Sequence, residues 1–261
     1  MDILKEILAQ KRKRVEAAKV ELPLAEVIEH AATQRASATP HRLRRALSTG
    51  RVNIIAEFKR RSPSKGVINA EATLHLVARN YEAGRAAAMS VLTEADFFDG
   101  SIEDLKTVKK IVELPVLRKD FIFDEYQVHE SAMIGADAVL LIVAALDDAT
   151  LLGLRELIED KLGMDALVEV HDDEEMARAT AAGAGLIGVN NRNLRTFNVS
   201  LDTSLKLAQA ATPETILVSE SGISSKKDIQ LLREAGYQGF LIGESLMRSE
   251  NPVAALCELM S

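Results

Sequence analysis

Lysine and glutamate recur where short apolar segments end along this sequence. Glu57 lies two residues before Lys59, and Glu169 lies two residues before His171. Side chains two apart on a strand point to the same side, so each pair could interact on one face. Lys119 ends another apolar segment. Acids and bases gathered in one place can protonate a carbonyl group and remove a proton, which indicates general acid–base chemistry.

The polar residues at the segment ends form a larger set. They are Glu57, Lys59, Glu94, Lys119, Asp120, Glu169, His171, Asn190, Arg192, Glu220, Ser221, Gly243 and Glu244, whereas the fourth segment contributes only Leu141, Ile142 and Val143. Enclosed charges are costly unless opposite charges pair, so any single pair could be a structural salt bridge. The whole set favours catalysis, because the opposite ends of the segments carry no comparable set.

Small residues near the end of the chain predict a phosphate site. Ser221 precedes Gly222, and Gly243 precedes Glu244. Where side chains are small, backbone N–H groups can approach an anion closely. Either glycine could simply mark a turn, but both follow the last two apolar segments, which is the usual phosphate position in a barrel.

The loop at 60–66 could close over the same phosphate, because it is cationic and rich in hydroxyl groups. It contains Arg60, Arg61, Ser62, Ser64 and Gly66. The alternative is an ordinary turn marked by Pro63 and Gly66.

Four phenylalanines cluster beyond the second and third segments, in a chain with only 4% aromatic residues. They are Phe97, Phe98, Phe121 and Phe123. We expect two of them to pack in the core and the others to line a pocket for a flat ring.

Eight apolar segments are the predicted strands that position these groups. They span 53–59, 86–94, 114–121, 136–144, 164–171, 184–192, 214–221 and 237–245. Helical periodicity occupies 70–83, 102–112, 125–134, 147–162, 172–182, 201–210, 226–235 and 245–260. Strands that are apolar along their whole length suit a parallel sheet covered on both faces. Eight alternations predict a single (β/α)8 TIM barrel over 51–261, and the missing GxGxxG and GxxxxGK[ST] motifs argue against an open doubly wound sheet.

The first 50 residues fall outside this alternation and predict a helical extension that packs on the barrel. Helical periodicity covers 3–18 and 24–32, with Pro23 between them. The basic run at 11–14 could attract phosphate, but the acidic balance of the chain favours a solvated helix face.

The composition excludes several classes of protein. A formal charge of −7 argues against nucleic acid or an anionic membrane as partner, because both need a concentrated positive surface. A single cysteine, Cys257, excludes an internal disulfide, and no Cys/His cluster suggests a metal. The N-terminus has no apolar h-region, and the longest apolar run, 138–146, is too short to span a bilayer. We therefore expect a cytoplasmic enzyme that binds a phosphorylated small molecule and acts as a monomer or weak homodimer.

Eight motifs in this order resemble those of the indole-3-glycerol-phosphate synthase family. They are IAEFKRRSPSKG, LTEADFFDGS, PVLRKDFI, ADAVLLIV, LVEVHD, IGVNNRNL, VSESGI and FLIGESLM. The resemblance implies a lyase of tryptophan biosynthesis that needs no metal or organic cofactor. Its substrate would be 1-(2-carboxyphenylamino)-1-deoxyribulose 5-phosphate, and its products indole-3-glycerol phosphate, CO2 and water.

The resemblance also implies roles for individual residues. Lys119 would be the general acid, Glu169 a general base or cation stabiliser, and Glu57 with Lys59 the other catalytic pair; the two lysines would share ring closure and dehydration. Asn190 and Ser221 would contact the polar chain of the substrate, Arg192 its carboxylate, and Phe98, Phe121 and Leu140 its ring. Ser62, Gly222, Gly243 and the backbone N–H of Glu244 would hold the phosphate, and His171 would act through a neighbour.

Three alternatives follow from the same residues. A phosphoribosylanthranilate isomerase would be expected to use a Cys/Asp pair, but the one cysteine lies in the last predicted helix. A Schiff-base aldolase would form a covalent adduct on Lys119 or Lys59. A barrel used only as a protein-binding scaffold would not depend on Lys119 or Glu169.

Overall fold

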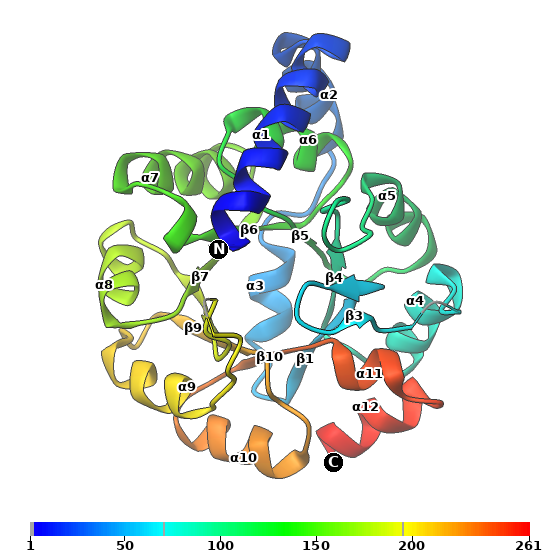
Figure 1. Ribbon diagram of the computed structural model, residues 1–261, viewed down its shortest axis with the longest axis vertical. Helices are drawn as coiled ribbons and strands as arrows, with labels where there is room; N and C mark the ends of the chain where they lie inside the picture. The colour runs from blue at the N-terminus through cyan, green and yellow to red at the C-terminus, as the bar shows by residue number, and fades with distance from the viewer. Residues whose placement is uncertain (1–2, 70, 195) are drawn as a thin grey trace.

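Eight parallel strands close into a barrel in this computed structural model, which describes residues 3–69, 71–194 and 196–261. The strands are β1 (Asn53–Phe58), β4 (Ala88–Leu92), β5 (Val116–Lys119), β6 (Ala138–Ile142), β7 (Asp165–Val170), β8 (Leu186–Asn190), β9 (Ile216–Glu220) and β10 (Gly239–Ile242). β10 closes the barrel against β1, with Asn53 opposite Gly239. The predicted (β/α)8 barrel is therefore confirmed, and Figure 1 shows its ring of helices.

The helices around the barrel follow the predicted periodic segments. They are α4 (Leu74–Ala83), α5 (Ile102–Ile111), α6 (Glu125–Met133), α7 (Asp148–Glu156), α8 (Asp173–Ala181), α9 (Asp202–Leu207), α10 (Lys226–Glu234), α11 (Glu244–Arg248) and α12 (Pro252–Met260). Serine or aspartate side chains accept a hydrogen bond from the first turn of several helices, as at Ser101, Asp124 and Asp172.

Three helix boundaries differ from the prediction. The segment predicted as one helix at 245–260 is two helices, because Pro252 has no N–H to continue a helix and starts α12 after the cap at Asn251. The segment at 147–162 ends in a π-helical turn, Leu157–Lys161. The helix predicted from residue 70 begins at Leu74, and residue 70 itself lies outside the described residues.

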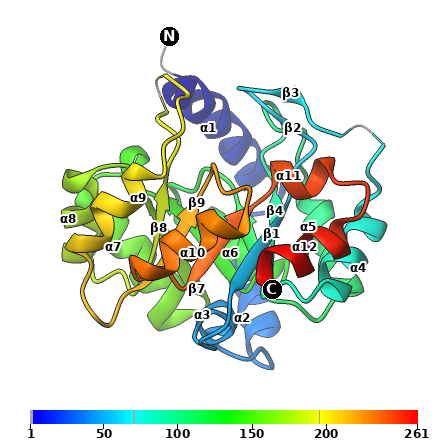
Figure 2. The ribbon, with the colours of Figure 1, turned by 90° about the horizontal axis from the view of Figure 1, so that it is seen from below.

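The N-terminal extension contains three helices, one more than predicted. α1 (Ile3–Glu21) lies over the carboxyl ends of the strands, and α2 (Leu24–Arg35) packs against α6. The helix that was not predicted, α3 (Arg42–Leu47), lies at the opposite end of the barrel (Figure 2). Its Leu43 and Leu47 pack among the side chains of the barrel interior, so α3 closes that end.

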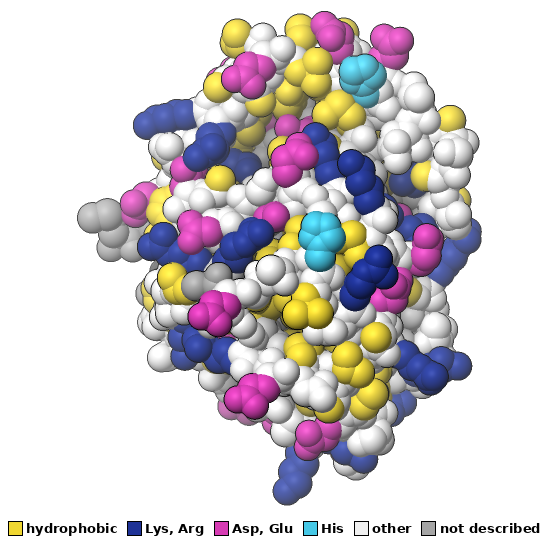
Figure 3. Space-filling view, turned by 90° about the vertical axis from the view of Figure 1, so that its right-hand side faces the viewer, with side chains coloured by type: hydrophobic (Ala, Val, Ile, Leu, Met, Phe, Trp, Pro, Cys, Tyr) yellow, Lys and Arg dark blue, Asp and Glu magenta, His cyan; other side chains and the backbone are white. Residues whose placement is uncertain are grey.

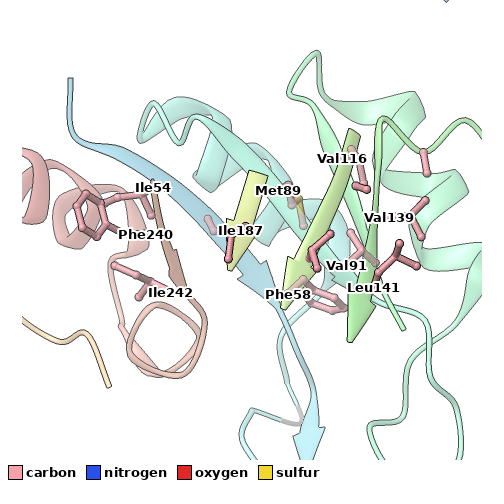
Figure 4. Close-up of a cluster of buried hydrophobic side chains, with 14 of the residues drawn as sticks. Ile54, Phe58, Met89, Val91, Val116, Val139, Leu141, Ile187, Phe240 and Ile242 are labelled. Carbon is pink, nitrogen blue, oxygen red and sulfur yellow. The ribbon is translucent and has the colours of Figure 1, made fainter. Parts of the chain in front are cut away.

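Alternate strand residues divide the core into two layers, because successive side chains point to opposite faces. Outward residues such as Phe58, Val91 and Phe240 pack beneath the surrounding helices (Figure 4). Inward residues such as Leu117 and Leu167 fill the interior of the barrel. The polar residues at the strand ends therefore stand on a rigid, fully packed support.

A second ionic cluster lies at the amino ends of the strands, so the expectation that this face carries no comparable charged set was wrong. Asp137 accepts hydrogen bonds from Arg42 and from Lys109, the latter at 2.6 Å. Asp165 accepts one from the backbone N–H of Arg44, whose guanidinium also pairs with Glu159. These contacts fasten α3 to the barrel, so this cluster has a structural task.

The outer surface carries charges of both signs. On the face shown in Figure 3, acidic and basic side chains are interspersed, with small groups of hydrophobic side chains between them. Among the described residues, no helix is both long and apolar enough to cross a membrane.

Candidate active site

Four charged side chains form one layer inside the mouth of the barrel. Glu57, Lys119, Glu169 and Glu220 come from β1, β5, β7 and β9, which are alternate strands of the barrel. Lys119 Nζ lies 2.9 Å from Glu169 Oε2 and 3.1 Å from Glu220 Oε2. Lys59 Nζ lies 2.5 Å from Glu57 Oε1. The structure thus brings together all four predicted catalytic residues and adds Glu220.

Lys119, Glu169 and Glu220 shift one another's pKa values, and the charge of Glu57 adds to the shifts of Lys119 and Glu220. Burial alone would lower the pKa of Lys119, but Glu169, Glu220 and Glu57 outweigh burial and raise it. Burial would raise the pKa of Glu169, yet Lys119 and His171 hold it below its ordinary value. Burial and the neighbouring Glu169 and Glu57 raise the pKa of Glu220 to about 7, against the opposing effect of Lys119. Near neutral pH, Glu220 is therefore a carboxyl group that can both hold and release a proton.

A pocket lies directly above this layer. Its lining includes Glu57, Lys59, Ser62, Phe98, Lys119, Phe121, Leu140, Glu169, Asn190, Arg192, Ser221 and Glu244, all of which the sequence predicted as site residues. Gly222 and Gly243, the other two predicted positions, are chain neighbours of lining residues. Gly243 also makes room for Glu57, because a Cβ there would lie 2.7 Å from Glu57 Oε1.

One wall of the pocket is apolar and aromatic. The rings of Phe98 and Phe121 are tilted, with centroids 6.1 Å apart. Leu140 and Ile142 complete this wall. Leu141, proposed from the sequence as the fourth strand's contribution together with Ile142 and Val143, instead packs outward in the core, because it alternates with the two inward residues.

Phe123 and Val143 also lie away from the pocket. Phe123 packs against the core beneath the loops, and Val143 is buried with it. The expectation that the phenylalanines divide between core and pocket is confirmed for Phe98, Phe121 and Phe123.

Polar side chains on the opposite wall are linked through Asn190. Its Oδ1 accepts hydrogen bonds from Ser221 Oγ at 2.9 Å and from the backbone N–H of Arg192 at 3.0 Å. Its Nδ2 donates to Glu169 Oε1 at 3.3 Å. Asn190 therefore connects the charged layer to the residues predicted to contact the polar chain and carboxylate of a substrate.

The loop after β1 folds as a short hairpin of β2 (Arg61–Ser62) and β3 (Gly66–Val67). Ser62 is buried and lines the pocket. Arg60 and Arg61, which the sequence placed in a loop that could close over a phosphate, do not line the pocket in this structure. Arg60 donates to both carboxylate oxygens of Asp104, and Arg61 lies nearest Asp99, so both guanidinium groups are engaged away from the pocket.

Neither interpretation of the basic run at 11–14 describes Lys11. Its Nζ donates to Asp120 Oδ2 at 2.7 Å, and the two side chains are 8% and 0% exposed. Arg14 pairs with Asp96, so the run fastens α1 to the barrel mouth. That placement brings Ile3 and Ile7 of α1 into the lining of the pocket.

Sequence reasoning gave one lining residue no role of its own and missed two other kinds. Glu220 belonged to the set of strand-end residues that favours catalysis, but only its neighbour Ser221 received an individual role. The apolar residues of α1 gave no signal beyond helix periodicity. Leu194 and Phe197 lie in the loop after β8, where the sequence has no regular pattern. No cluster of three metal-ligating side chains is found within residues 3–69, 71–194 and 196–261.

Comparison with known proteins gives one consistent family. A family model described as indole-3-glycerol phosphate synthase matches residues 4–259. Indole-3-glycerol phosphate synthase of Carboxydothermus hydrogenoformans is 48% identical over 263 aligned positions, covering 99% of each chain. The enzyme of the same name from Desulfosudis oleivorans is 47% identical and covers 100% of this chain and 99% of its own.

Solved structures of other barrels share only the fold. A 3-hexulose-6-phosphate synthase from Salmonella typhimurium superposes with a TM-score of 0.65 at 14% identity, covering 80% of this chain and 97% of its own. A thiamine phosphate pyrophosphorylase from Pyrococcus furiosus gives 0.61 at 18% identity, covering 83% and 95%.

Proposed function

Because the chain belongs to the indole-3-glycerol phosphate synthase family, we propose that its pocket converts 1-(2-carboxyphenylamino)-1-deoxyribulose 5-phosphate to indole-3-glycerol phosphate. CO2 and water are the other products of this step of tryptophan biosynthesis. The observation that carries the residue assignment is the position of Lys119, held between Glu169 and Glu220 at the floor of a pocket with an aromatic wall.

The reaction requires three proton transfers and the cleavage of one C–C bond and one C–O bond. The ring carbon that bears the carboxylate attacks the ribulose carbonyl carbon, a C–C bond forms, and the carbonyl oxygen becomes a hydroxyl group by taking a proton. The C–CO2 bond then breaks, and its electron pair restores the aromatic ring. Finally the hydroxyl group leaves as water while the adjacent carbon loses a proton. At least one acid and one base must therefore act in a pocket that excludes water.

Lys119 is the proposed donor to the carbonyl oxygen. The surrounding carboxylates keep it protonated, and its ammonium group stabilises negative charge that develops on that oxygen. Glu220, 3.1 Å away and with a pKa of about 7, can return a proton to Lys119 after the transfer. Glu169 stays ionised and stabilises the cationic ring that ring closure creates.

Lys59 and Glu57 are the second proposed acid and base. They form a close pair at the edge of the same layer, and the single strand β4 separates β1 from β5, which carries Lys119. One member can protonate the departing hydroxyl group while the other accepts the proton from the adjacent carbon. We assign ring closure and dehydration to the two lysines jointly.

The rest of the pocket supports binding of the two ends of this substrate. Phe98, Phe121 and Leu140 suit the aromatic ring, and Arg192 suits its carboxylate. At the other end, Ser62 lines the same pocket as Ser221 and Glu244, the chain neighbours of Gly222 and Gly243, and the backbone N–H groups of these loops can hold the phosphate. Asn190 and Ser221, which are hydrogen-bonded to each other and also line the pocket, can contact the hydroxyl groups of the substrate.

The test is to incubate the purified protein with the carboxyphenylamino ribulose phosphate and follow indole fluorescence. Turnover is expected without added metal. Lys119→Met should lower kcat by roughly 10²- to 10⁴-fold, the usual contribution of a general acid, with little change in the inhibition constant of inorganic phosphate. Folded wild-type protein that forms no indole product would contradict the proposal.

Two further outcomes would identify a different activity. Borohydride trapping of a substrate carbonyl on Lys119 or Lys59 would indicate a Schiff-base aldolase. Unchanged function in Lys119→Ala and Glu169→Ala would indicate a scaffold. For location and assembly we propose a reducing cytoplasm, which suits the single exposed Cys257, and a monomer or weak homodimer.

A further inference from the structure

His171 is held between two carboxylates just behind the charged layer. Its Nδ1 lies 2.9 Å from Glu175 Oε2, and its Nε2 lies 3.3 Å from Glu169 Oε1. The side chain is 12% exposed. Glu175 Oε2 also accepts a hydrogen bond from the backbone N–H of His171 at 2.8 Å, so Glu175 fixes both the backbone and the ring of this residue.

The two ring contacts favour a charged ring, although they differ in kind. Nδ1 is hydrogen-bonded to Glu175, whereas Nε2 lies at ion-pair distance from Glu169 without hydrogen-bond alignment. A neutral imidazole has one N–H and can donate from only one nitrogen, whereas the imidazolium ion donates from both. Carboxylates accept but do not donate when ionised. With a carboxylate facing each nitrogen, the arrangement fits the imidazolium ion, and the same two neighbours outweigh burial and raise the pKa of His171 to about 10.

Glu169 is therefore restrained from three directions. Its Oε2 accepts from Lys119, while its Oε1 lies within 3.3 Å of both Asn190 Nδ2 and His171 Nε2. Lys119 is the one of these partners that gives up its charge in the proposed reaction. Once Lys119 has transferred its proton, the positive charge that remains in contact with Glu169 is that of His171.

We propose that His171, clamped as an imidazolium ion by Glu175, is a positioning residue that holds Glu169 in place and keeps it ionised while Lys119 is deprotonated. This inference rests on the proposed function, because it concerns the step in which Lys119 transfers its proton. The pair acts from outside the pocket: His171 and Glu175 line an adjoining polar groove and do not line the pocket over the charged layer.

Other charged groups border His171 and set the background for its titration. Asp172 and Glu175 come from the start of α8, Glu169 from β7, Arg192 from the loop after β8, and Lys5 from α1. Asp172 caps α8 by accepting a hydrogen bond from the N–H of Glu175, whose carboxylate contacts His171 Nδ1. A test must therefore separate the contribution of Glu175 from the general acidity of this helix end.

The first test measures His171 itself in the unliganded protein. Imidazole ¹⁵N resonances followed from pH 5 to 10 should show a ring that stays cationic through pH 8. In Glu175→Gln, the pKa of His171 should fall toward its ordinary value. Glu174→Gln is the matched control, because Glu174 is exposed on the same helical turn, and it should leave the titration unchanged. A wild-type ring that titrates near its ordinary pKa of about 6.5 would overturn the inference whatever the enzyme's activity.

The second test measures turnover in His171→Gln, which removes the positive charge. We expect kcat to fall roughly ten- to one-hundredfold, as when a group that orients a functional ligand is lost, with little change in KM. Without the cation, the pKa of Glu169 rises, so the acid limb of the kcat profile should move to higher pH. Glu175→Gln should shift the limb in the same direction, and Glu174→Gln should not.

The outcomes separate this inference from the proposed function. Wild-type protein without turnover contradicts the proposed function, while the imidazole titration still tests the state of His171. Wild-type turnover that His171→Gln leaves unchanged in kcat and in pH profile overturns the positioning role alone. Circular dichroism and the unfolding midpoint show that each variant is folded.

Discussion

The carboxylate of Glu220 occupies the space that a side chain at Gly188 would need. The two residues lie on adjacent strands, β9 and β8, and a Cβ on Gly188 would come within 2.2 Å of Glu220 Oε1. Val189 and Asn190 follow with ordinary side chains, so the requirement for glycine is local to this one position. The absence of a side chain at Gly188 therefore allows the carboxyl group of Glu220 to take up its position beside Lys119.

Gly188→Ala should displace Glu220 and with it the pair that Glu220 forms with Lys119. We expect kcat to fall roughly one-hundredfold, as for a misplacement of about 1 Å in a reacting group. Overpacking should also lower the free energy of unfolding by about 1–3 kcal/mol. Steady-state indole fluorescence and urea unfolding measure the two effects.

Two controls make this prediction specific. Gly153→Ala, at an exposed position of α7 with no atom within 4 Å of a new Cβ, should keep full activity and gain roughly 0.5–1 kcal/mol of stability. In a Glu220→Ala background, Gly188→Ala should have little further effect on kcat. A full additional loss in that background would show that Gly188 acts through something other than Glu220.

The pH dependence of kcat/KM should report Glu220. Its pKa of about 7 lies above the ordinary value of a carboxyl group, so it holds a proton below pH 7 and loses it above. Because the protonated form restores Lys119, activity should decline as pH rises through 7. In Glu220→Gln this inflection should disappear and the rate should be roughly 10²-fold lower. The substrate phosphate, which titrates near pH 6, affects both proteins alike, so an inflection near 7 that survives in the variant would contradict the assignment.

The sequence was sufficient for the strands because each is a continuous apolar run that ends in polar residues. It failed at α3, where the six residues RLRRAL are too short and too basic to show a helical stripe. Their role depends on Asp137 and Asp165, which lie 95 and 121 residues from Arg42 and Arg44. Pairing at that distance along the chain leaves no local pattern.

Contacts between residues far apart in the sequence also explain what the sequence did not predict at the site. The sequence placed Glu220 and Ser221 together at a strand end, and only the structure shows both facing the pocket. The sequence placed Arg60 in a loop that could close over a phosphate, and it gave no sign of the partner Asp104, which comes from α5. Lys11 belongs to a run of four basic residues. Which of the four contacts the barrel depends on the face of α1 that is turned toward the barrel.

Lys11→Met should destabilise the protein. Lys11 and Asp120 are buried, and Asp120 also accepts from Thr93 and from Arg118, which is itself 1% exposed. Removing one partner of a buried ion pair leaves charge without full compensation, at a cost of about 3 kcal/mol. Urea unfolding at pH 7 measures this loss. Lys13→Met, at an exposed position of the same helix, should change stability by no more than about 0.5 kcal/mol. Equal effects would show that Lys11 contributes only as surface charge.

Gly222→Ala and Gly236→Ala should separate phosphate binding from backbone strain. Both glycines have positive φ, +81° and +104°, so alanine at either should cost about 1 kcal/mol or more of stability. At Gly236 a Cβ has no atom within 4 Å, whereas at Gly222 it would lie 2.5 Å from Val199 Cγ1 and disturb the loop that follows Ser221. Gly222→Ala alone should therefore raise the inhibition constant of inorganic phosphate, by about tenfold or roughly 1.4 kcal/mol. If both variants lose stability and neither changes phosphate inhibition, the phosphate does not bind at this loop.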